Sequence, residues 1–256
     1  MRLCCLLAVA FAFLLVANAS ATTIVIIRTR THIVIASDSK AQYQGDQGAP
    51  QVCKIAKQNE TYFVVAGLAR DTYRGYLASR TISSAIARGQ TFDEQANAVE
   101  ADMLHALTTE LTQLRTEDQP GFNFAVSGEA PSSIALVTME AGIPKVVVFS
   151  FLYDKATGKV TSRRDSCPGT CTGDDFIIQL GRALSEEEVS KVTGSASRMA
   201  KTLVELEIQR DPTNVGPPVE LVELRTSGPE WLQDDLNCAA ESNVRKKYPH
   251  SVTIEF

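Results

Sequence analysis

Two stretches decide the fold: Thr23-Ile24-Val25-Ile26-Ile27 and Ile33-Val34-Ile35-Ala36. Both are apolar and rich in β-branched residues, and the polar residues 28–32 separate them. This pattern is typical of two strands joined by a tight connection. Because the apolar residues follow one another without alternation, we expect both faces of the resulting sheet to be covered.

The rest of the chain alternates between strand and helix patterns. Apolar runs predict further strands at 52–57, 62–66, 122–126, 134–139, 146–151, 176–180 and 219–224, and near Trp231. The resulting order is strands, two helices, strands, two helices and strands. Sheets that are apolar on both faces need covering layers, which favours an α+β fold in which two sheets pack on each other with helices outside.

Two helices are expected after the first four strands. Asp71 is the expected cap of the first, which would end at Arg88-Gly89 with Gly89 in a left-handed conformation. The capping box Thr91-Phe92-Asp93-Glu94 opens the second, whose apolar stripe continues to Leu114.

A second helical region is expected near the C-terminal end. The capping box Ser185-Glu186-Glu187-Glu188 opens it, Gly194 interrupts it, and Asp211-Pro212 ends it. The segment bounded by Thr157-Gly158 and residues 167–173 is interpreted as a variable excursion from the core.

The first residues have the features of a secretory signal peptide. One basic residue precedes an uncharged apolar core, Leu6 to Val16, and Ala19-Ser20-Ala21 fits the A-x-A cleavage pattern. The apolar run is shorter than the roughly 20 residues that a membrane span needs. We therefore expect 1–21 to be a signal peptide and 22–256 to be a single domain. Cleavage after Ala19 and a retained N-terminal anchor are the alternatives.

Charge and cysteine content narrow the classes of partner and cofactor. The formal net charge of −5, with both signs interspersed, argues against a nucleic acid partner. Cys167 and Cys171 form the expected local disulfide and Cys53 and Cys238 the candidate second one, although the four cysteines that follow the predicted signal peptide allow three pairings. The histidines are scattered singly and the usual zinc-ligand spacing is absent, so neither a metal nor a cofactor is expected.

One set of residues points to chemistry. Thr22 directly follows the cleavage pattern, Asp38 and Lys54 come after it at equal intervals, and Gly67 ends the fourth strand. In these residues, and in the strands that carry them, the segment 22–67 resembles the N-terminal part of a proteasome β-subunit. Proteasome β-subunits belong to the N-terminal-nucleophile hydrolases, and the resemblance implies their four-layer αββα sandwich.

The resemblance also implies a role for each residue. Thr22 would be the nucleophile, with its own α-amine as the base. Lys54 would lie near the hydroxyl and favour its deprotonated form, and Asp38 would orient Lys54 through a charge-assisted hydrogen bond. The backbone N–H of Gly67 would stabilise the oxyanion. Peptides or small amides would be the substrates, and assembly into a homo-oligomer is implied by the family alone.

A later motif departs from the family. Asp211-Pro212-Thr213-Asn214 resembles an Asp-x-x-Ser-Gly motif that supports the nucleophile, but Asn214 replaces the Ser and Val215 the Gly. Asp211 and Asn214 are therefore candidate supporting residues. The same departures favour the alternative hypothesis, a catalytically inactive exported protein that keeps the proteasome-like fold as a binding or structural module.

Each of these residues also has an ordinary interpretation. Thr22 could begin a β-branched strand, and Asp38 and Lys54 could be solvated charges. Their spacing and the adjacent cleavage site favour catalysis. The expected location is secreted or periplasmic, and a membrane is a partner only if the signal segment is retained. Asn59-Glu60-Thr61 is an N-glycosylation sequon at a predicted turn.

Overall fold

The computed structural model describes residues 22–41, 50–71, 73–128, 130–171, 175–241 and 254–255. In this part the chain has an α+β fold with antiparallel sheets, as the sequence predicts. The predicted signal peptide, 1–21, lies outside the described residues. Within the described ranges, no helix is long and apolar enough to span a membrane.

The first sheet is built around the two apolar stretches. Its central strands are β1 (Thr23–Arg28) and β2 (Ile33–Asp38), which pair antiparallel. β10 (Phe176–Gly181) pairs with the other side of β1, while β11 (Val219–Arg225) and then β12 (Gly228–Gln233) extend the sheet beyond β2. Every residue of β1 and β2 is buried, so both faces of these strands are covered.

A second five-stranded sheet and a small third one complete the strands. The strands of the second sheet, in spatial order, are β3 (Ile55–Gln58), β4 (Thr61–Gly67), β7 (Ser132–Glu140), β8 (Ile143–Asp154) and β9 (Lys159–Cys167). The third sheet contains β13 (Ile254–Glu255), β5 (Arg70–Asp71) and β6 (Tyr76–Leu77).

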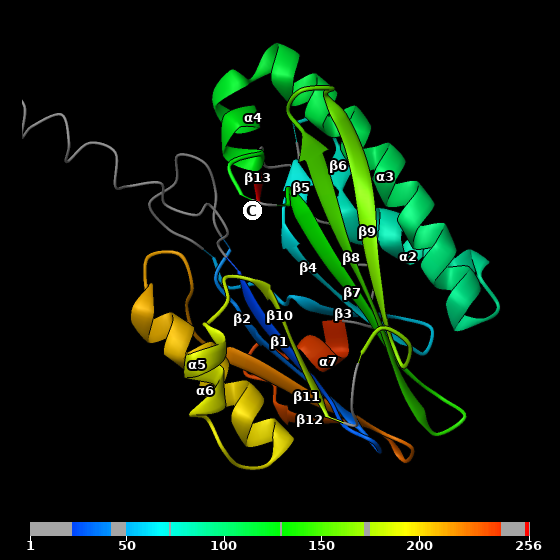
Figure 1. Cartoon of the computed structure of the whole chain (residues 1–256), viewed down its shortest axis with the longest axis vertical. Helices are drawn as coiled ribbons and strands as arrows, with labels where there is room; N and C mark the ends of the chain where they lie inside the picture. Colours follow the sequence, from blue (N-terminus) through cyan, green and yellow to red (C-terminus); the bar gives the residue numbers. More distant parts are fainter. Residues whose placement is uncertain are drawn as a thin grey trace, which may run out of the picture.

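Helices cover one face of each large sheet (Figure 1). The helices on the second sheet are α2 (Ala78–Arg88), α3 (Phe92–Glu117) and α4 (Gln119–Ala125). Those on the first sheet are α5 (Glu186–Ser190) and α6 (Ala196–Arg210), and the short α7 (Cys238–Glu241) lies against β3. Both predicted capping boxes are present, at the starts of α3 and α5.

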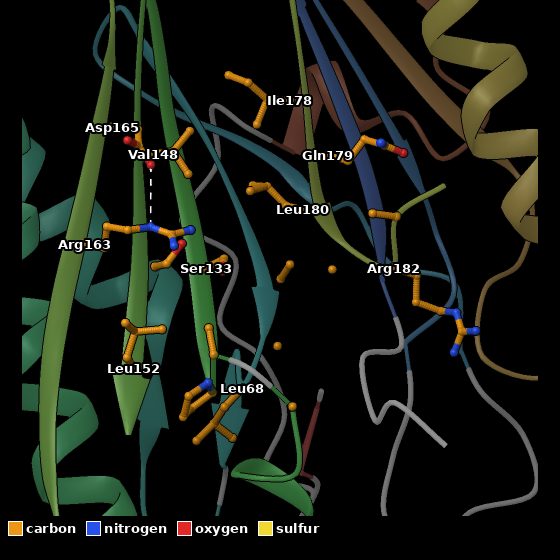
Figure 2. A pocket seen from close by; sticks show the side chains of 18 of the residues that line it. Leu68, Ser133, Val148, Leu152, Arg163, Asp165, Ile178, Gln179, Leu180 and Arg182 are labelled. Carbon is orange, nitrogen blue, oxygen red and sulfur yellow. Dashed lines mark ion pairs between the residues drawn. The ribbon is translucent and has the colours of Figure 1, made fainter. Parts of the chain in front are cut away.

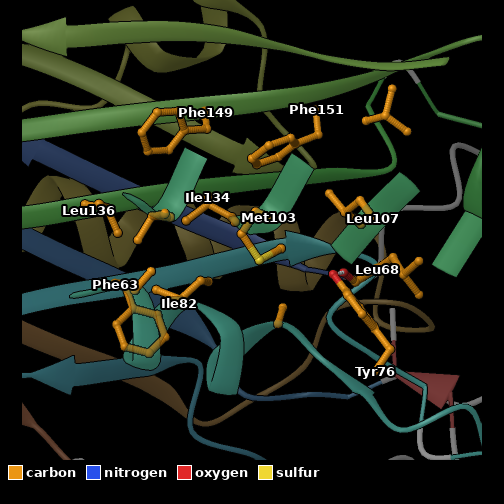
Figure 3. Close-up of a cluster of buried hydrophobic side chains, with 14 of the residues drawn as sticks. Phe63, Leu68, Tyr76, Ile82, Met103, Leu107, Ile134, Leu136, Phe149 and Phe151 are labelled. Atoms are coloured by element: carbon orange, nitrogen blue, oxygen red, sulfur yellow. Dashed lines mark hydrogen bonds between the residues drawn. The ribbon is translucent and has the colours of Figure 1, made fainter. Parts of the chain in front are cut away.

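Three clusters of buried apolar side chains hold these elements together. The cluster beneath α2 and α3 includes Met103, Leu107 and Phe149 (Figure 3). A second cluster lies between α6 and the first sheet, and a third lies between the two large sheets. Ile24 faces the other sheet and Val25 faces α6, because successive side chains of a strand point to opposite faces.

The strand predicted at 122–126 is wrong, because these residues form most of α4 and its C-cap. The side chain of Asp118 accepts a hydrogen bond from the backbone N–H of Gly121 at 3.0 Å, and Pro120 lies in the first turn. Proline is favoured there because its missing N–H would have no partner inside the helix. These signals, just before the apolar run, predict a helix better than the run predicts a strand.

Two predicted helix ends also need correction. Asp71 does not cap α2, whose N-cap is Leu77; instead its carboxylate accepts hydrogen bonds from the N–H groups of Tyr73 and Arg74 in the β5–β6 turn. Gly89 has an extended conformation, with φ −86°, rather than a left-handed one. A Cβ at that position would lie 2.6 Å from the backbone nitrogen of Gln95, so close packing explains this glycine.

The predicted excursion contains a strand that the sequence analysis missed. β9 pairs with β8 along its whole length, and many of its residues are polar and exposed because it is the edge of the sheet. Both expected disulfides are present, with Cα–Cα distances of 5.5 Å for Cys53 and Cys238 and 5.2 Å for Cys167 and Cys171.

Candidate active site

Thr22, Asp38 and Lys54 lie together, although each comes from a different element. Thr22 directly precedes β1, Asp38 ends β2, and Lys54 directly precedes β3. The ammonium of Lys54 donates to the Thr22 hydroxyl, with Nζ 3.2 Å from Oγ1, and to the Asp38 carboxylate, with Nζ 2.8 Å from Oδ1. The lysine therefore bridges the hydroxyl and the carboxylate.

Backbone donors hold the Asp38 carboxylate in place. Oδ1 also accepts from the N–H of Thr23 at 2.9 Å, and Oδ2 accepts from the N–H of Lys40 at 3.2 Å and of Gly216 at 3.3 Å. Asp38 is fully buried and only 8% of the Lys54 side chain is exposed. Because solvent is nearly excluded, the pair is screened little, and the positive charge beside the Thr22 oxygen favours a developing negative charge there.

Gly67 lies at the end of β4, where the chain turns sharply. Its φ is +91°, and a Cβ would come within 2.4 Å of the carbonyl oxygen of Pro131. The N–H of the next residue, Leu68, donates to that same oxygen at 2.8 Å. Only glycine fits this position without strain, and Gly67 lines a cleft.

This cleft has a volume of about 650 Å³ and opens between the two large sheets. Figure 2 shows Leu68, Ser133, Val148 and Leu152 along one wall and Ile178, Leu180 and Arg182 along the other. Arg163 and Asp165, 3.7 Å apart between Nε and Oδ2, add charge on β9. The walls are thus mixed in polarity, and the cleft reaches Gly181 and Arg182, next to the nucleophile candidate.

Arg182 links the cleft to Thr22. Its backbone N–H donates to the Thr22 carbonyl oxygen at 2.8 Å, and its guanidinium contacts Asp211 at 2.9 Å and Glu207 at 3.6 Å. Asp211 also accepts hydrogen bonds from the side chains of Thr213 and Asn214. The predicted supporting residues Asp211 and Asn214 therefore contact each other, and Asp211 reaches Thr22 through Arg182.

The charge on Asp211 is stabilised by these contacts. Burial alone would raise the pKa of its carboxyl, but hydrogen bonds from Thr213 and Asn214 and the positive charge of Arg182 together lower the pKa below its ordinary value. Asp211 is thus a fixed anion at the end of α6 that anchors Arg182.

Lys40 and Gly216 were not predicted to be site residues from the sequence. Lys40 Nζ donates to the carbonyl oxygens of Pro212 and Thr213 at 2.8 and 2.6 Å, so it ties the end of β2 to the loop after α6. A Cβ on Gly216 would lie 3.0 Å from Cδ of Lys40. The glycine at 216 was the one local signal of this contact in the sequence. It indicates that another residue packs closely against the backbone there, but not which residue.

One further group of residues has the chemistry of metal ligands. Side-chain atoms of Glu220, Asp234 and Cys238 lie within 4.8 Å of one another, and Cys238 forms the disulfide with Cys53.

No protein-family model matches the chain, and no curated protein sequence matches it significantly.

Proposed function

We propose that this chain is a threonine-type N-terminal-nucleophile hydrolase that cleaves amide bonds, with peptides as the main substrate class. The observation that carries the proposal is the Lys54 ammonium, which lies 3.2 Å from the Thr22 hydroxyl and 2.8 Å from the Asp38 carboxylate. An ordinary solvated lysine would not be buried in this bridge between a hydroxyl and an anion.

The proposed reaction begins once the chain starts at Thr22. The free α-amine takes the proton of the hydroxyl, and the oxygen attacks the amide carbon. The N–H of Gly67 stabilises the oxyanion, while the charge of Lys54 favours the nucleophilic oxygen. The leaving amine takes a proton as the C–N bond breaks, which leaves an ester on Thr22. Water then hydrolyses the ester and restores the hydroxyl.

The arrangement of the core supports assigning the chain to a proteasome-like fold. Apolar clusters lie between α6 and the first sheet, between the two sheets, and between the second sheet and α2 and α3. Three such interfaces are what a four-layer αββα sandwich requires. The position of Thr22 before the first residue of β1 agrees with this assignment.

The proposed activating step is removal of residues 1–21 by signal peptidase during export. This cleavage creates the α-amine that the mechanism needs, so no separate propeptide has to be removed. Two disulfides favour an oxidising compartment, which supports a secreted or periplasmic location. Ring or other homo-oligomer assembly follows only from the resemblance.

Covalent labelling tests the proposal. Protein whose N-terminus at Thr22 has been verified by intact mass is treated with a β-lactone, which acylates a nucleophilic hydroxyl. We expect one adduct per chain on Thr22, none in Thr22→Ala, and a labelling rate lower by on the order of 10² in Lys54→Met. Thr31→Ala, in the exposed β1–β2 turn, is the matched control and should label as the wild type does. Absence of an adduct on the verified wild-type N-terminus would contradict the mechanism.

A second candidate is an exported binding or structural module without activity. Asn214 and Val215, at positions where the resemblance leads one to expect Ser and Gly, favour it. Hydrolysis of a peptide library by the verified wild type, and its loss in Thr22→Ala, would exclude this candidate. Peptide binding without hydrolysis would support it.

A further inference from the structure

Four potential metal ligands meet at the C-terminal end of the fold. Cys53 precedes β3, Glu220 lies near the start of β11, Asp234 follows β12, and Cys238 begins α7. Side-chain ligand atoms of the last three all lie within 4.8 Å of one another, and the disulfide joins the Cys53 sulfur to that of Cys238. Cys53 therefore borders the cluster that the other three residues form.

The Glu220 carboxylate is buried without enough partners. The residue is fully buried, its Oε1 accepts one hydrogen bond from the N–H of Leu236 at 3.2 Å, and its Oε2 has no hydrogen-bond partner. A buried carboxylate oxygen without a partner costs free energy. One carboxylate oxygen of Glu220 lies within 4.8 Å of a carboxylate oxygen of Asp234 in the same cluster.

Asp234 is itself a carboxylate, so it cannot neutralise the charge of Glu220. Its two oxygens accept backbone hydrogen bonds from the N–H groups of Cys238 and Ala239 at the start of α7. A buried carboxylate beside a second, partly buried one needs a shared proton or a cation.

We propose that this cluster is a redox-gated zinc site, in which reduction of the Cys53–Cys238 disulfide lets both sulfurs and the carboxylates of Glu220 and Asp234 bind one Zn²⁺. Zinc binds sulfur at about 2.3 Å and carboxylate oxygen at about 2.0–2.2 Å in tetrahedral geometry, so ligand atoms lie roughly 3.3–3.8 Å apart. Glu220, Asp234 and Cys238 reach that spacing with shifts of about 1 Å, and Cys53 joins them once the two sulfurs separate.

The chemical steps balance with a dithiol as the reductant. The dithiol gives two electrons to the S–S bond and becomes a cyclic disulfide, while Cys53 and Cys238 take up the two protons. Zn²⁺ binding then releases these two protons, because thiolates rather than thiols are the ligands. The segments that carry Cys53 and Cys238 are then joined by a metal ion instead of a disulfide bond.

The ligand set selects the metal. Two thiolates with two carboxylates suit zinc, whereas calcium and magnesium prefer oxygen ligands alone. Because Cys53 directly precedes Lys54, the metal would keep the start of β3 fastened to α7 when the disulfide is reduced. The proposal does not depend on hydrolase activity.

Cobalt substitution and zinc titration test the site. The full chain is reduced with a phosphine, the reductant is removed, and Co²⁺ or Zn²⁺ is added. We expect one metal ion per chain, with cobalt–thiolate charge-transfer bands and the intense visible bands of tetrahedral Co²⁺. The oxidised chain should show neither. Glu220→Gln and Asp234→Asn should each weaken zinc binding about tenfold or more.

The second disulfide supplies the matched control. A Cys167→Ser/Cys171→Ser variant keeps the proposed ligands and should bind as the reduced wild type does, whereas Cys53→Ser/Cys238→Ser should lose the cobalt–thiolate bands. Circular dichroism checks that each variant is folded. Bands that depend on Cys167 and Cys171, or zinc affinity that is unchanged in both Glu220→Gln and Asp234→Asn, would overturn the proposal. No metal binding by the reduced wild type would overturn it as well.

Discussion

The Asp38–Lys54 pair places two opposite charges in a buried position. Asp38 is fully buried, and its carboxylate accepts hydrogen bonds from the backbone N–H groups of Thr23, Lys40 and Gly216. Such a pair contributes little net stability when intact, because burying each charge costs about as much as their attraction returns. Removing one partner is costly because the other charge stays buried.

Asp38→Ala should therefore lower the free energy of unfolding by about 3–5 kcal/mol, because the Lys54 ammonium loses its counter-charge. Urea unfolding at neutral pH measures the change. Lys201→Ala, which removes an exposed i,i+4 pair with Glu205, is the control and should change stability by less than about 1 kcal/mol. Equal losses in the two variants would show that the buried pair has no special role.

Glu110, on α3, predicts a pH dependence of stability. Burial, and then a hydrogen bond with Asp71, raise the pKa of its carboxyl to about 8 from an ordinary value near 4.5. The folded chain thus holds a proton that the unfolded chain releases between about pH 5 and pH 8. In that window stability should fall as pH rises, by about 1.4 kcal/mol per pH unit for one proton.

Glu110→Gln should lower this slope by about 1.4 kcal/mol per pH unit, because the amide keeps hydrogen-bonding groups and has no proton to release. Urea unfolding at several pH values between about 5 and 8 compares the two proteins. Glu187→Gln, at a carboxylate whose side chain is 80% exposed, should keep the wild-type slope. A slope in Glu110→Gln as steep as that of the wild type would contradict the assignment.

At the scale of elements, the end of β4 is the most constrained point of the site. Gly67 combines φ +91° with a Pro131 carbonyl oxygen only 2.4 Å from where a Cβ would lie. The β4–β7 pairing ends at this residue, opposite Ser132. The backbone there is fixed by both its own conformation and its neighbour, which suits a position proposed to donate a hydrogen bond to an oxyanion.

Gly67→Ala should destabilise the fold more than Gly75→Ala does. Both glycines have positive φ, but nothing lies within 4 Å of a Cβ at Gly75, whose φ is +74°. The difference between the two variants should be about 1–3 kcal/mol, which is the cost of overpacking alone. Urea unfolding gives the difference, and β-lactone labelling should slow only in Gly67→Ala, because the displaced backbone moves its N–H away from the oxyanion. Equal free energies of unfolding in the two variants would show that the backbone near Pro131 can move to accommodate a Cβ at position 67 without loss of stability.

At the scale of the whole molecule, the Cys53–Cys238 disulfide joins segments that are 185 residues apart in sequence. It fastens the start of β3 to α7, near the C-terminal end of the described structure. The Cys167–Cys171 disulfide closes a loop with a separation of only 4 residues. Because a cross-link stabilises mainly by restricting the unfolded chain, the two should differ in effect.

Cys53→Ala/Cys238→Ala should lower the free energy of unfolding by about 5 kcal/mol in zinc-free buffer, and Cys167→Ala/Cys171→Ala by about 2 kcal/mol. Denaturant unfolding of the oxidised proteins measures both. A larger loss from the small loop than from the large one would contradict the entropic account.

The sequence by itself determined the local features of this protein. Continuous apolar runs predicted the two-sided burial of β1 and β2, and hydroxyl and glutamate pairs predicted the caps of α3 and α5. These signals lie within a few residues of what they control. Where two local signals competed, as at 122–126, the apolar run misled and the cap at Asp118 decided the structure.

Only the tertiary structure decided which distant residues meet. Strand register and the loop after α6 bring Arg182 to Thr22 and Gly216 to Asp38, and packing of α7 brings Glu220, Asp234 and two cysteines together. The contacts of Arg182 with Thr22 and of Gly216 with Asp38 join residues more than a hundred positions apart, and no local pattern encodes them. The equal spacing of Thr22, Asp38 and Lys54 was informative because each lies at the end of one of the first strands, so that local structure already directs them to one edge.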